Sequence, residues 1–441
     1  MEKQDPQLVH LADFKPPSAA RAWVSIPNPN GLPLIATATS EKTVRVYSLS
    51  NFTLHSTLEG GHSRSIRSVA WKPSTQNNGE LCIATGSFDS TMGLWRRKEE
   101  DGALGAGGSG EPLELEVTRN GIKHDEEGSD DGEDWEFAIV LEGHDSEVKH
   151  VAYSPSGQWL ASCSRDKSIW IWEEIGEEGD DEFETVAVLQ EHTADVKCVS
   201  WRAASSYKDE GEVLASASYD DTIRLWREEE EGEWGCFAVM EGHDGTVWSL
   251  EWEPSVSVKR FDLEDGRPPR LLSSSADGTI RLWSLAPAAP SPNKPSYFNS
   301  GIPSTMRPAP AAEKWICTAI LPKVHDLPVY SISWSARTGQ VVSTGGDGRV
   351  AIYEERKREP AGTEAEPKPE EAAESAEPSA KTEWVVLTIL DGAHGPYEVN
   401  HVTWCPRYDA GKKSADEEIV ITTGDDGLVK AWTVEGSPIE S

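Results

Sequence analysis

Apolar and polar residues alternate in short runs along most of the chain, and tight polar turns separate the runs. The clearest example lies between residues 148 and 189, where the runs are VKHVAY, WLASCS, SIWIW and FETVAVL. Alternation with a period of two is typical of β-strands whose two faces meet different surroundings. The pattern therefore predicts a unit of four short strands, which we call a, b, c and d in chain order.

Polar residues at fixed spacing mark further copies of this unit. In six copies a His precedes strand a, and an Asp lies four residues after a hydroxyl and six residues before a Trp or Tyr. Four of these sets are His62, Thr85, Asp89 and Trp95; His144, Ser162, Asp166 and Trp172; His192, Ser216, Asp220 and Trp226; and His243, Ser273, Asp277 and Trp283. The other two are His325, Ser343, Asp347 and Tyr353, and His394, Thr422, Asp426 and Trp432.

A seventh, degraded copy comes first in the chain, with Thr37, Glu41 and Tyr47 at the same spacing but no Gly-His before it. This spacing is that of the WD40 repeat, in which four strands form one blade of a propeller. The sequence thus predicts an all-β fold, a seven-bladed WD40 β-propeller that forms a single domain over residues 1–441.

Each His, hydroxyl, Asp and Trp set can form one chain of buried hydrogen bonds that ties a turn to the neighbouring strand. Buried polar groups need such partners. Since the set recurs in every blade, we interpret it as a structural tetrad. A catalytic triad would instead need an exposed nucleophile at one site.

The ring of blades needs a closing strand. After Trp432 there is only a short tail and no fourth strand, whereas the apolar run 8–14, LVHLADF, has no strand before it. An unclosed ring would leave sheet edges exposed. We therefore expect this N-terminal run to supply the outer strand of the seventh blade.

Five insertions follow strand c and account for the excess length. They span residues 98–134, 173–184, 227–234, 284–313 and 354–384. Four are acidic and carry most of the excess negative charge of a chain whose net charge is −35, and 284–313 is Pro-rich. Their composition is typical of disordered, solvated segments.

The connections d–a and b–c are short from the second blade onward, so one face of the propeller, the compact face, presents only short loops. A rigid face with short loops favours binding. Two positions per blade are expected there: the residue five after the His, and the residue just before the turn Asp. They form a basic and aromatic crescent: Arg67, Phe88, Lys149, Arg165, Lys197, Tyr219, Trp248 and Tyr330. Arg, Trp and Tyr are enriched at interface hot spots, and a carboxylate or an acidic-aromatic peptide would suit the crescent.

Composition excludes several other classes of protein. No apolar stretch is long enough to cross a membrane, and the N-terminus lacks the pattern of a signal peptide, so we expect a soluble intracellular protein that binds no membrane. The strongly negative charge argues against nucleic-acid binding. The six cysteines form no C-x-x-C pair. We expect them to be buried reduced thiols, and we expect no metal site, cofactor or catalytic residue.

The stretch Ser162–Glu173, Ser-Cys-Ser-Arg-Asp-Lys-Ser-Ile-Trp-Ile-Trp-Glu, is more specific. It resembles the third-blade signature of the WD40 subunit of the cytosolic iron–sulfur protein assembly (CIA) targeting complex. Gly143-His144 to Tyr153 fits as well. The resemblance covers the seven repeats, is most specific in blades two to four, and leaves the five insertions out.

The resemblance implies a non-enzymatic adaptor, cytoplasmic and also nuclear, that helps deliver iron–sulfur clusters to apoproteins. Implied partners are the other targeting subunits (a small assembly subunit and a HEAT-repeat scaffold), a hydrogenase-like cluster carrier and client apoproteins. The family's protein would act as a monomer within a hetero-complex and is not itself the cluster ligand. The family's functionally important Arg corresponds to Arg165. The alternative is another WD40 adaptor, one that reads chromatin or recruits ubiquitin-ligase substrates.

Overall fold

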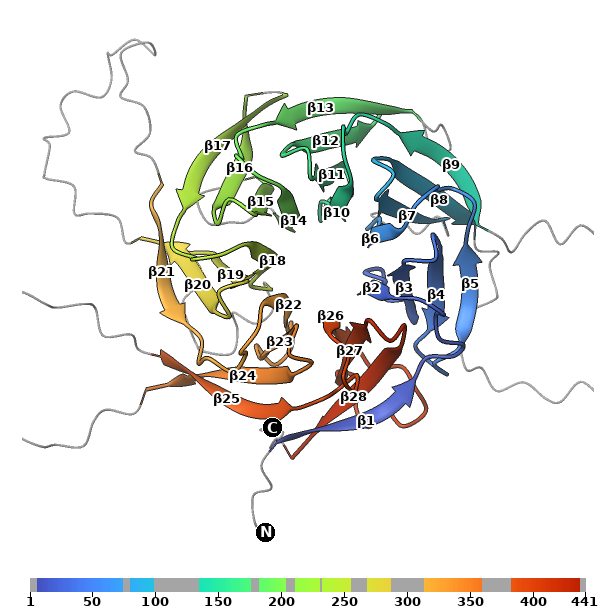
Figure 1. Cartoon of the computed structure of the whole chain (residues 1–441), viewed down its shortest axis with the longest axis vertical. Coiled ribbons are helices and arrows are strands. Elements are labelled where there is room, and N and C mark those ends of the chain that lie inside the picture. The colour runs from blue at the N-terminus through green and yellow to red at the C-terminus, as the bar shows by residue number, and fades with distance from the viewer. Residues whose placement is uncertain are drawn as a thin grey trace, which may run out of the picture.

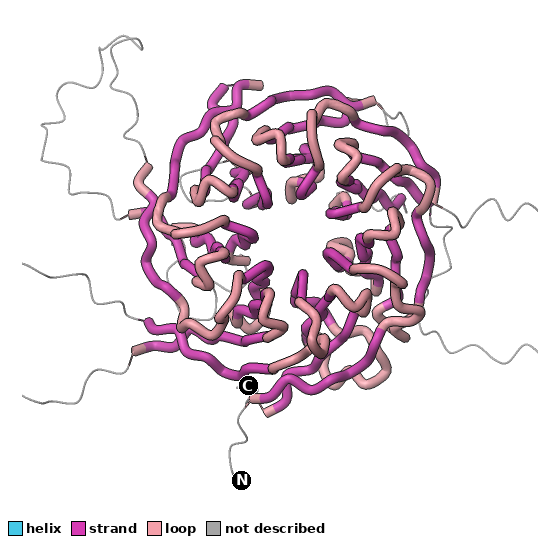
Figure 2. Tube along the Cα trace, viewed as in Figure 1, coloured by secondary structure: helices cyan, strands magenta, loops and turns pink. Residues whose placement is uncertain are grey.

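The computed structural model describes residues 6–73, 80–98, 135–175, 182–203, 211–230, 232–254, 268–286, 313–358 and 382–436. Within these ranges the chain forms 28 strands in seven four-stranded antiparallel sheets, which are arranged as blades around one axis (Figures 1 and 2). The predicted all-β, seven-bladed propeller is confirmed. No helix long and apolar enough to cross a membrane occurs in the described part of the chain.

The first four blades follow one another along the chain, each with strand a innermost and strand d outermost (Figure 1). Their strands are β2 (Ala22–Pro27), β3 (Leu34–Thr39), β4 (Val44–Ser48) and β5 (Leu54–Leu58); β6 (Ile66–Trp71), β7 (Glu80–Ser87), β8 (Met92–Lys98) and β9 (Glu136–Leu141); β10 (Val148–Tyr153), β11 (Trp159–Ser164), β12 (Ile169–Glu174) and β13 (Phe183–Leu189); and β14 (Val196–Arg202), β15 (Val213–Ser218), β16 (Ile223–Glu230) and β17 (Glu233–Met240).

The last three blades complete the ring, and the seventh takes its outer strand from the N-terminus. Their strands are β18 (Val247–Trp252), β19 (Arg270–Ser275), β20 (Ile280–Leu285) and β21 (Trp315–Ile320); β22 (Val329–Trp334), β23 (Val341–Gly345), β24 (Val350–Lys357) and β25 (Thr382–Leu390); and β26 (Val399–Pro406), β27 (Glu418–Gly424), β28 (Val429–Glu435) and β1 (Gln7–Asp13).

The N-terminal strand closes the ring as expected. β1 pairs antiparallel with β28, and the His10 ring packs edge-on against Trp432 at 5.2 Å between centroids. Phe14 is fully buried, and its N–H donates to the Val429 carbonyl at 3.0 Å. The two ends of the chain thus share one sheet, which leaves no blade without its fourth strand.

Neighbouring blades are joined by apolar packing and by hydrogen bonds between their innermost strands. One buried cluster combines Val24 and Leu34 of the first blade with Ile66 and Val69 of the second. Side-chain acceptors on one strand a also receive backbone N–H groups of the next. Ser68 Oγ accepts the Val151 N–H at 3.1 Å, and Ser331 Oγ accepts the Val402 N–H at 3.2 Å. Such bonds satisfy buried amides that no sheet partner reaches.

The structure brings each predicted tetrad of blades two to five together. The His Nδ1 lies 2.8–3.2 Å from the Asp carboxylate, and the His Nε2 lies 2.7–2.8 Å from the hydroxyl oxygen. The Trp Nε1–H donates to the same hydroxyl at 2.8–3.3 Å. Each hydroxyl thus accepts from Trp and donates to His, whose Nδ1–H donates to Asp. The chain of bonds is complete, as burial requires.

The carboxylate of each tetrad is held in its charged form. Burial alone would raise the pKa of Asp166, but the hydrogen bonds from His144 and Ser168 outweigh it and keep this pKa well below its usual range. The backbone N–H of Asp145 donates to the same carboxylate at 2.9 Å. Asp166 therefore links the strand turn to the loop that carries His144.

Replacing Asp166 with alanine is expected to cost about 1–3 kcal/mol, because His144 Nδ1 and the Asp145 N–H lose their acceptor in a buried site. Since the pKa of Asp166 is lower in the folded state, its stabilisation is present above about pH 4 and is lost as the pH falls further. Thermal melting at pH 7 and pH 3 measures both effects. The exposed Asp145→Ala variant is the control. Equal melting temperatures of wild type and Asp166→Ala at pH 7 would contradict a stabilising role of the tetrad.

The first blade has a different set of hydrogen bonds in place of those made by the missing His. Glu41 accepts from the Ser18 hydroxyl at 2.8 Å and from Arg45 at 3.0 Å. The Tyr47 hydroxyl donates to the Pro16 carbonyl at 2.9 Å. Segment 16–18 therefore ties the turn of the first blade as the His does elsewhere.

The disorder expected for one of the five insertions is wrong. Residues 227–234 were predicted to be disordered, yet β16 and β17 stay paired along this segment up to Glu230 and Glu233. The Trp234 ring packs against Trp159 at 5.1 Å, which anchors the hairpin. A strand pair that extends beyond the core keeps its backbone hydrogen bonds without needing apolar residues, so acidic composition misled the prediction.

The other four insertions fall mainly on residues outside the described ranges. Their ends are strands: β8 reaches Lys98, β12 reaches Glu174, β20 reaches Leu285 and β24 reaches Lys357. The predicted disorder of residues 99–134, 176–181, 287–312 and 359–381 lies outside the described residues.

Candidate functional site

The turns between strands b and c meet the loops between strands d and a on one face of the propeller. In blade three the Arg165 N–H donates to the Glu147 carbonyl at 3.0 Å, and in blade four the Tyr219 N–H donates to the Asp195 carbonyl at 2.8 Å. The Phe88 N–H makes the same bond in blade two. This repeated bond places both predicted positions of each blade side by side on the compact face.

Cations of the crescent rest on aromatic rings of neighbouring positions. The Arg67 guanidinium lies over the Trp23 ring at 5.1 Å, and Lys149 Nζ lies over Phe88 at 4.5 Å. Lys197 Nζ lies over both Tyr219, at 5.4 Å, and Trp248, at 5.3 Å. Because a ring face attracts a cation without neutralising it, these residues stay positive while their positions are defined.

Arg165 lies in the turn between β11 and β12. Its side chain is 59% exposed, and its guanidinium lies 3.3 Å from Glu147. Glu147 also lies 3.4 Å from Lys149 Nζ, so one carboxylate serves two cations. An exposed ion pair of this kind contributes little stability, which leaves Arg165 able to exchange Glu147 for a carboxylate of a partner.

Positive charge is concentrated in the crescent against its own electrostatic cost. Burial lowers the pKa of Lys149, and the nearby charges of Lys197 and Arg67 lower it further, while Glu147 acts in the opposite direction. Cations placed close together repel one another unless a negative charge offsets the repulsion. An acidic ligand would do so.

The crescent ends in an aromatic pair. Trp248 and Tyr330 pack edge to face with centroids 5.5 Å apart. The Trp248 Nε1 is buried without a hydrogen-bond partner among the described residues. Burial, together with the charge of Glu398, raises the pKa of Tyr330 to about 12, so its hydroxyl remains a donor. This end offers apolar area with two polar tips, as recognition sites often do.

Sequence reasoning missed residues that belong to the same surface. Trp23 occupies in the first blade the position of Arg67, next to Phe88 at 6.2 Å. The sequence pattern did not reveal Trp23, because the first blade lacks the Gly-His from which the position is counted. In the structure, Ser25 pairs with Thr37 as Val69 pairs with Thr85, and this register makes Trp23 equivalent to Arg67. Arg64 also lies here, with its guanidinium donating to the Phe88 carbonyl at 2.8 Å.

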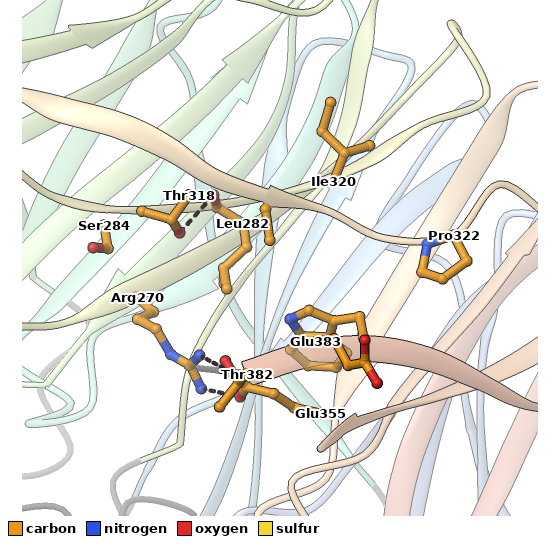
Figure 3. A pocket seen from close by; sticks show the side chains of 11 residues that line it. Arg270, Leu282, Ser284, Thr318, Ile320, Pro322, Glu355, Thr382 and Glu383 are labelled. Atoms are coloured by element: carbon orange, nitrogen blue, oxygen red, sulfur yellow. Dashed lines mark hydrogen bonds and ion pairs between the residues drawn. The ribbon is translucent and has the colours of Figure 1, made fainter. Parts of the chain in front are cut away.

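A pocket of about 490 Å³ lies away from the crescent, between blades five and six (Figure 3). Arg270, Glu355 and Trp384 are among the residues that line the pocket. Two of the polar side chains here already have partners: Arg270 is bound by two carboxylates, and the Thr382 hydroxyl donates to Glu355 at 2.7 Å. The pocket is therefore a less suitable binding site for an acidic partner than the crescent, where Arg165 and Lys149 share one carboxylate.

The six cysteines are all free thiols. Cys163, Cys198 and Cys405 are buried, whereas Cys82, Cys236 and Cys317 are half-buried. Burial raises the pKa of each thiol, to about 11 for Cys82 and about 12 for Cys198, so they stay protonated at neutral pH. In the described part of the chain no group of three or more His, Cys, Asp or Glu is placed to hold a metal ion.

Comparison with known proteins agrees with this architecture. The model of the family "WD domain, G-beta repeat" matches residues 52–96, 135–173, 183–227, 234–284 and 315–354. A protein of Botryotinia fuckeliana named "Probable cytosolic iron-sulfur protein assembly protein 1" is 65% identical, over 97% of this chain and 98% of its own length. Proteins of the same name from Sclerotinia sclerotiorum and Pyricularia oryzae are 63% and 51% identical, each over 98% of this chain and 97% of their own length.

The chain belongs to the family of cytosolic iron-sulfur protein assembly protein 1.

Membership in this family confirms the resemblance drawn from Ser162–Glu173. The WD40 model leaves out β2 to β4 of the first blade and the whole last blade. These two blades depart from the repeat, because the first lacks its His and the last borrows β1. The relatives nevertheless align over almost the whole chain. The similarity therefore extends to the ends that close the ring.

Proposed function

We propose that this protein is a non-enzymatic scaffold of cytosolic iron–sulfur protein assembly, and that the compact face is its docking surface. The names of its relatives support the process, and the crescent supports the mode of action. In this proposal the propeller holds assembly partners in place, while the cluster stays on other proteins. The protonated, half-buried or buried thiols fit this division of roles.

The observation that carries the docking surface is the group of cations held on aromatic rings around the axis. Lys149 and Lys197 each have one nearby carboxylate, and Arg67 has none among the described residues. Such a surface attracts an acidic segment of a partner, steers its approach, and binds apolar side chains beside it. The partners proposed are the other CIA targeting subunits, a hydrogenase-like cluster carrier and client apoproteins. The proposed location is the cytosol, with nuclear clients reached as well.

Arg165 is the residue proposed to contribute most to partner binding, because its side chain is exposed and its ion pair with Glu147 can be exchanged for one with a partner. Arg165→Glu is expected to weaken capture of at least one assembly partner by about tenfold or more, since the new carboxylate repels an acidic partner and sits beside Glu147. The fold should be unaffected, because the turn keeps its backbone bond to Glu147. Affinity purification of the tagged full chain, followed by mass spectrometry, measures capture.

Arg337→Glu is the matched control. Arg337 is exposed on the connection between β22 and β23, on the opposite face, and the charge change is the same. It should leave capture unchanged. Equal recovery of every assembly partner by wild type and Arg165→Glu would overturn the Arg165 assignment. Recovery of chromatin or ubiquitin-ligase subunits with no assembly factor would overturn the proposed process.

A further inference from the structure

The pocket between blades five and six lies at the outer rim of the ring. Apart from Arg270, its lining comes from β20 and β21 of blade five, from β24 and β25 of blade six, and from Pro322 just after β21. β21 and β25 are the outermost strands of their sheets, so each has a backbone edge with which no strand of the described chain pairs (Figure 1). The pocket volume of about 490 Å³ falls within the range of about 300–1,000 Å³ that proteins use for ligands. The rim therefore combines a pocket with two free strand edges.

The pocket has apolar walls and one polar group without a partner. Leu282 of blade five and Trp384 of blade six are both buried and belong to the same apolar cluster. The Trp384 Nε1 is buried, and it has no hydrogen-bond acceptor among the described residues. An indole N–H is a donor only, and a buried one usually has an acceptor. Because Trp384 lines the pocket, an occupant that contacts its ring can supply this acceptor.

The charge that the pocket offers to a ligand is negative. Arg270 is held by two carboxylates through four hydrogen bonds of 2.6–3.0 Å. Glu383 is exposed, and its carboxylate makes no ion pair within the described ranges. Its cross-strand neighbour on β24, Arg356, is bonded to Glu354 at 2.8 Å instead. The Glu383 carboxylate is thus free to bind a cation.

These features match a long basic side chain. Lysine and arginine carry a charged group on an apolar stem, so one side chain can satisfy an apolar wall and a carboxylate together. Ile320 and Pro322 line the blade-five side of the pocket, while Glu383 comes from β25 of blade six (Figure 3). A purely apolar side chain would leave Glu383 without a partner, and an acidic one would be repelled by it. The free edges of β21 and β25 suit the backbone of an extended segment.

We propose that this rim pocket binds a lysine or arginine side chain from an extended segment of a partner protein. The apolar stem packs on Leu282 and Trp384, and the cation pairs with Glu383. A backbone carbonyl of the segment accepts the Trp384 Nε1–H. The pocket lies away from the compact face, and its assignment does not rest on the proposed scaffold role. The crescent and the rim pocket thus select segments of opposite charge.

Titration of the full chain with defined peptides, followed by NMR of its indole N–H groups, tests the pocket. The probes are acetyl-Val-Lys-Val-amide and the same peptide with norleucine or glutamate at its centre. Trp384→Phe identifies the Trp384 signal among those of the 18 tryptophans. The lysine peptide should shift this signal saturably. The norleucine peptide, which keeps the stem without the charge, should bind about threefold more weakly, and the glutamate peptide more weakly still.

Glu383→Gln is expected to reduce the affinity for the lysine peptide to that for the norleucine peptide. The fold should be kept, because Glu383 is exposed, and melting temperatures verify this. Glu184→Gln is the matched control, since Glu184 is an exposed acid on β13, the outer strand of blade three. It should leave the affinity for the lysine peptide unchanged.

Three results would overturn the proposal. The first is a Trp384 signal that does not shift saturably with the lysine peptide. The second is equal affinity of wild type for the lysine and norleucine peptides. The third is equal weakening by Glu184→Gln and Glu383→Gln, which would indicate diffuse attraction to an acidic chain. The titration contains no assembly partner, so failure of the proposed scaffold role would leave its outcome unaffected.

Discussion

Replacing Arg270 with methionine is expected to destabilise the propeller by about 3–5 kcal/mol. Arg270 opens β19 of blade five and lies between two acids. One is Glu253 of the same blade, and the other is Glu355 of blade six (Figure 3). The three side chains are 6–10% exposed. Removing the cation would leave two carboxylates facing each other in a buried place.

Electrostatics of the triad support this size of effect. Burial alone would lower the pKa of Arg270, but the hydrogen bonds and charges of Glu253 and Glu355 outweigh it and raise this pKa above its usual range. The guanidinium makes bonds of 2.9 Å and 2.6 Å to Glu253, and of 3.0 Å and 2.9 Å to Glu355. It also covers the Trp334 ring at 5.2 Å. Arg270 thus joins two blades as well as two charges.

Urea unfolding of the full chain at pH 7 measures the loss. Arg356→Met is the control, because Arg356 pairs with Glu354 on the same β24 but its side chain is 54% exposed. That variant should change stability by less than about 1 kcal/mol. Adding Glu253→Gln and Glu355→Gln to Arg270→Met should recover part of the loss, since the repulsion is removed. If Arg270→Met and Arg356→Met unfold at the same urea concentration, the triad has no structural role.

Replacing Glu251 with glutamine is expected to stabilise the protein, and increasingly so as the pH rises. Burial raises the pKa of Glu251 from 4.5 to about 8, opposed by a hydrogen bond with the Trp334 backbone N–H. The unfolded chain releases this proton near pH 4.5, but the folded protein holds it until about pH 8. Wild type therefore loses stability between these two values, by up to about 5 kcal/mol.

The glutamine side chain resembles the protonated form and does not ionise. The difference in stability between Glu251→Gln and wild type should be near zero at pH 4.5, large at pH 7 and at its maximum at pH 9. Thermal melting at these three values measures it. Glu142→Gln, at an exposed position, should show no comparable trend. A stability difference between Glu251→Gln and wild type that does not change with pH would contradict a buried Glu251 carboxyl with a raised pKa.

Local patterns in the sequence determined the repeat and its internal brace. The spacing of His144, Ser162, Asp166 and Trp172 follows from the geometry of one blade, where the partners lie a turn or a strand apart. Because each blade repeats this geometry, the spacing also identified which positions face the compact side. The unpaired apolar run near Leu8 then followed from the need to close the ring.

Only the tertiary structure decided what meets between blades. Arg270 and Glu355 are separated by 85 positions, and no periodic signal links them. Trp23 was hidden because the first blade uses Ser18 instead of a His, and the acidic hairpin at 227–234 was hidden because its backbone pairing needs no apolar residues. Repeat periodicity describes a blade, whereas contacts between blades depend on the curvature and closure of the whole ring.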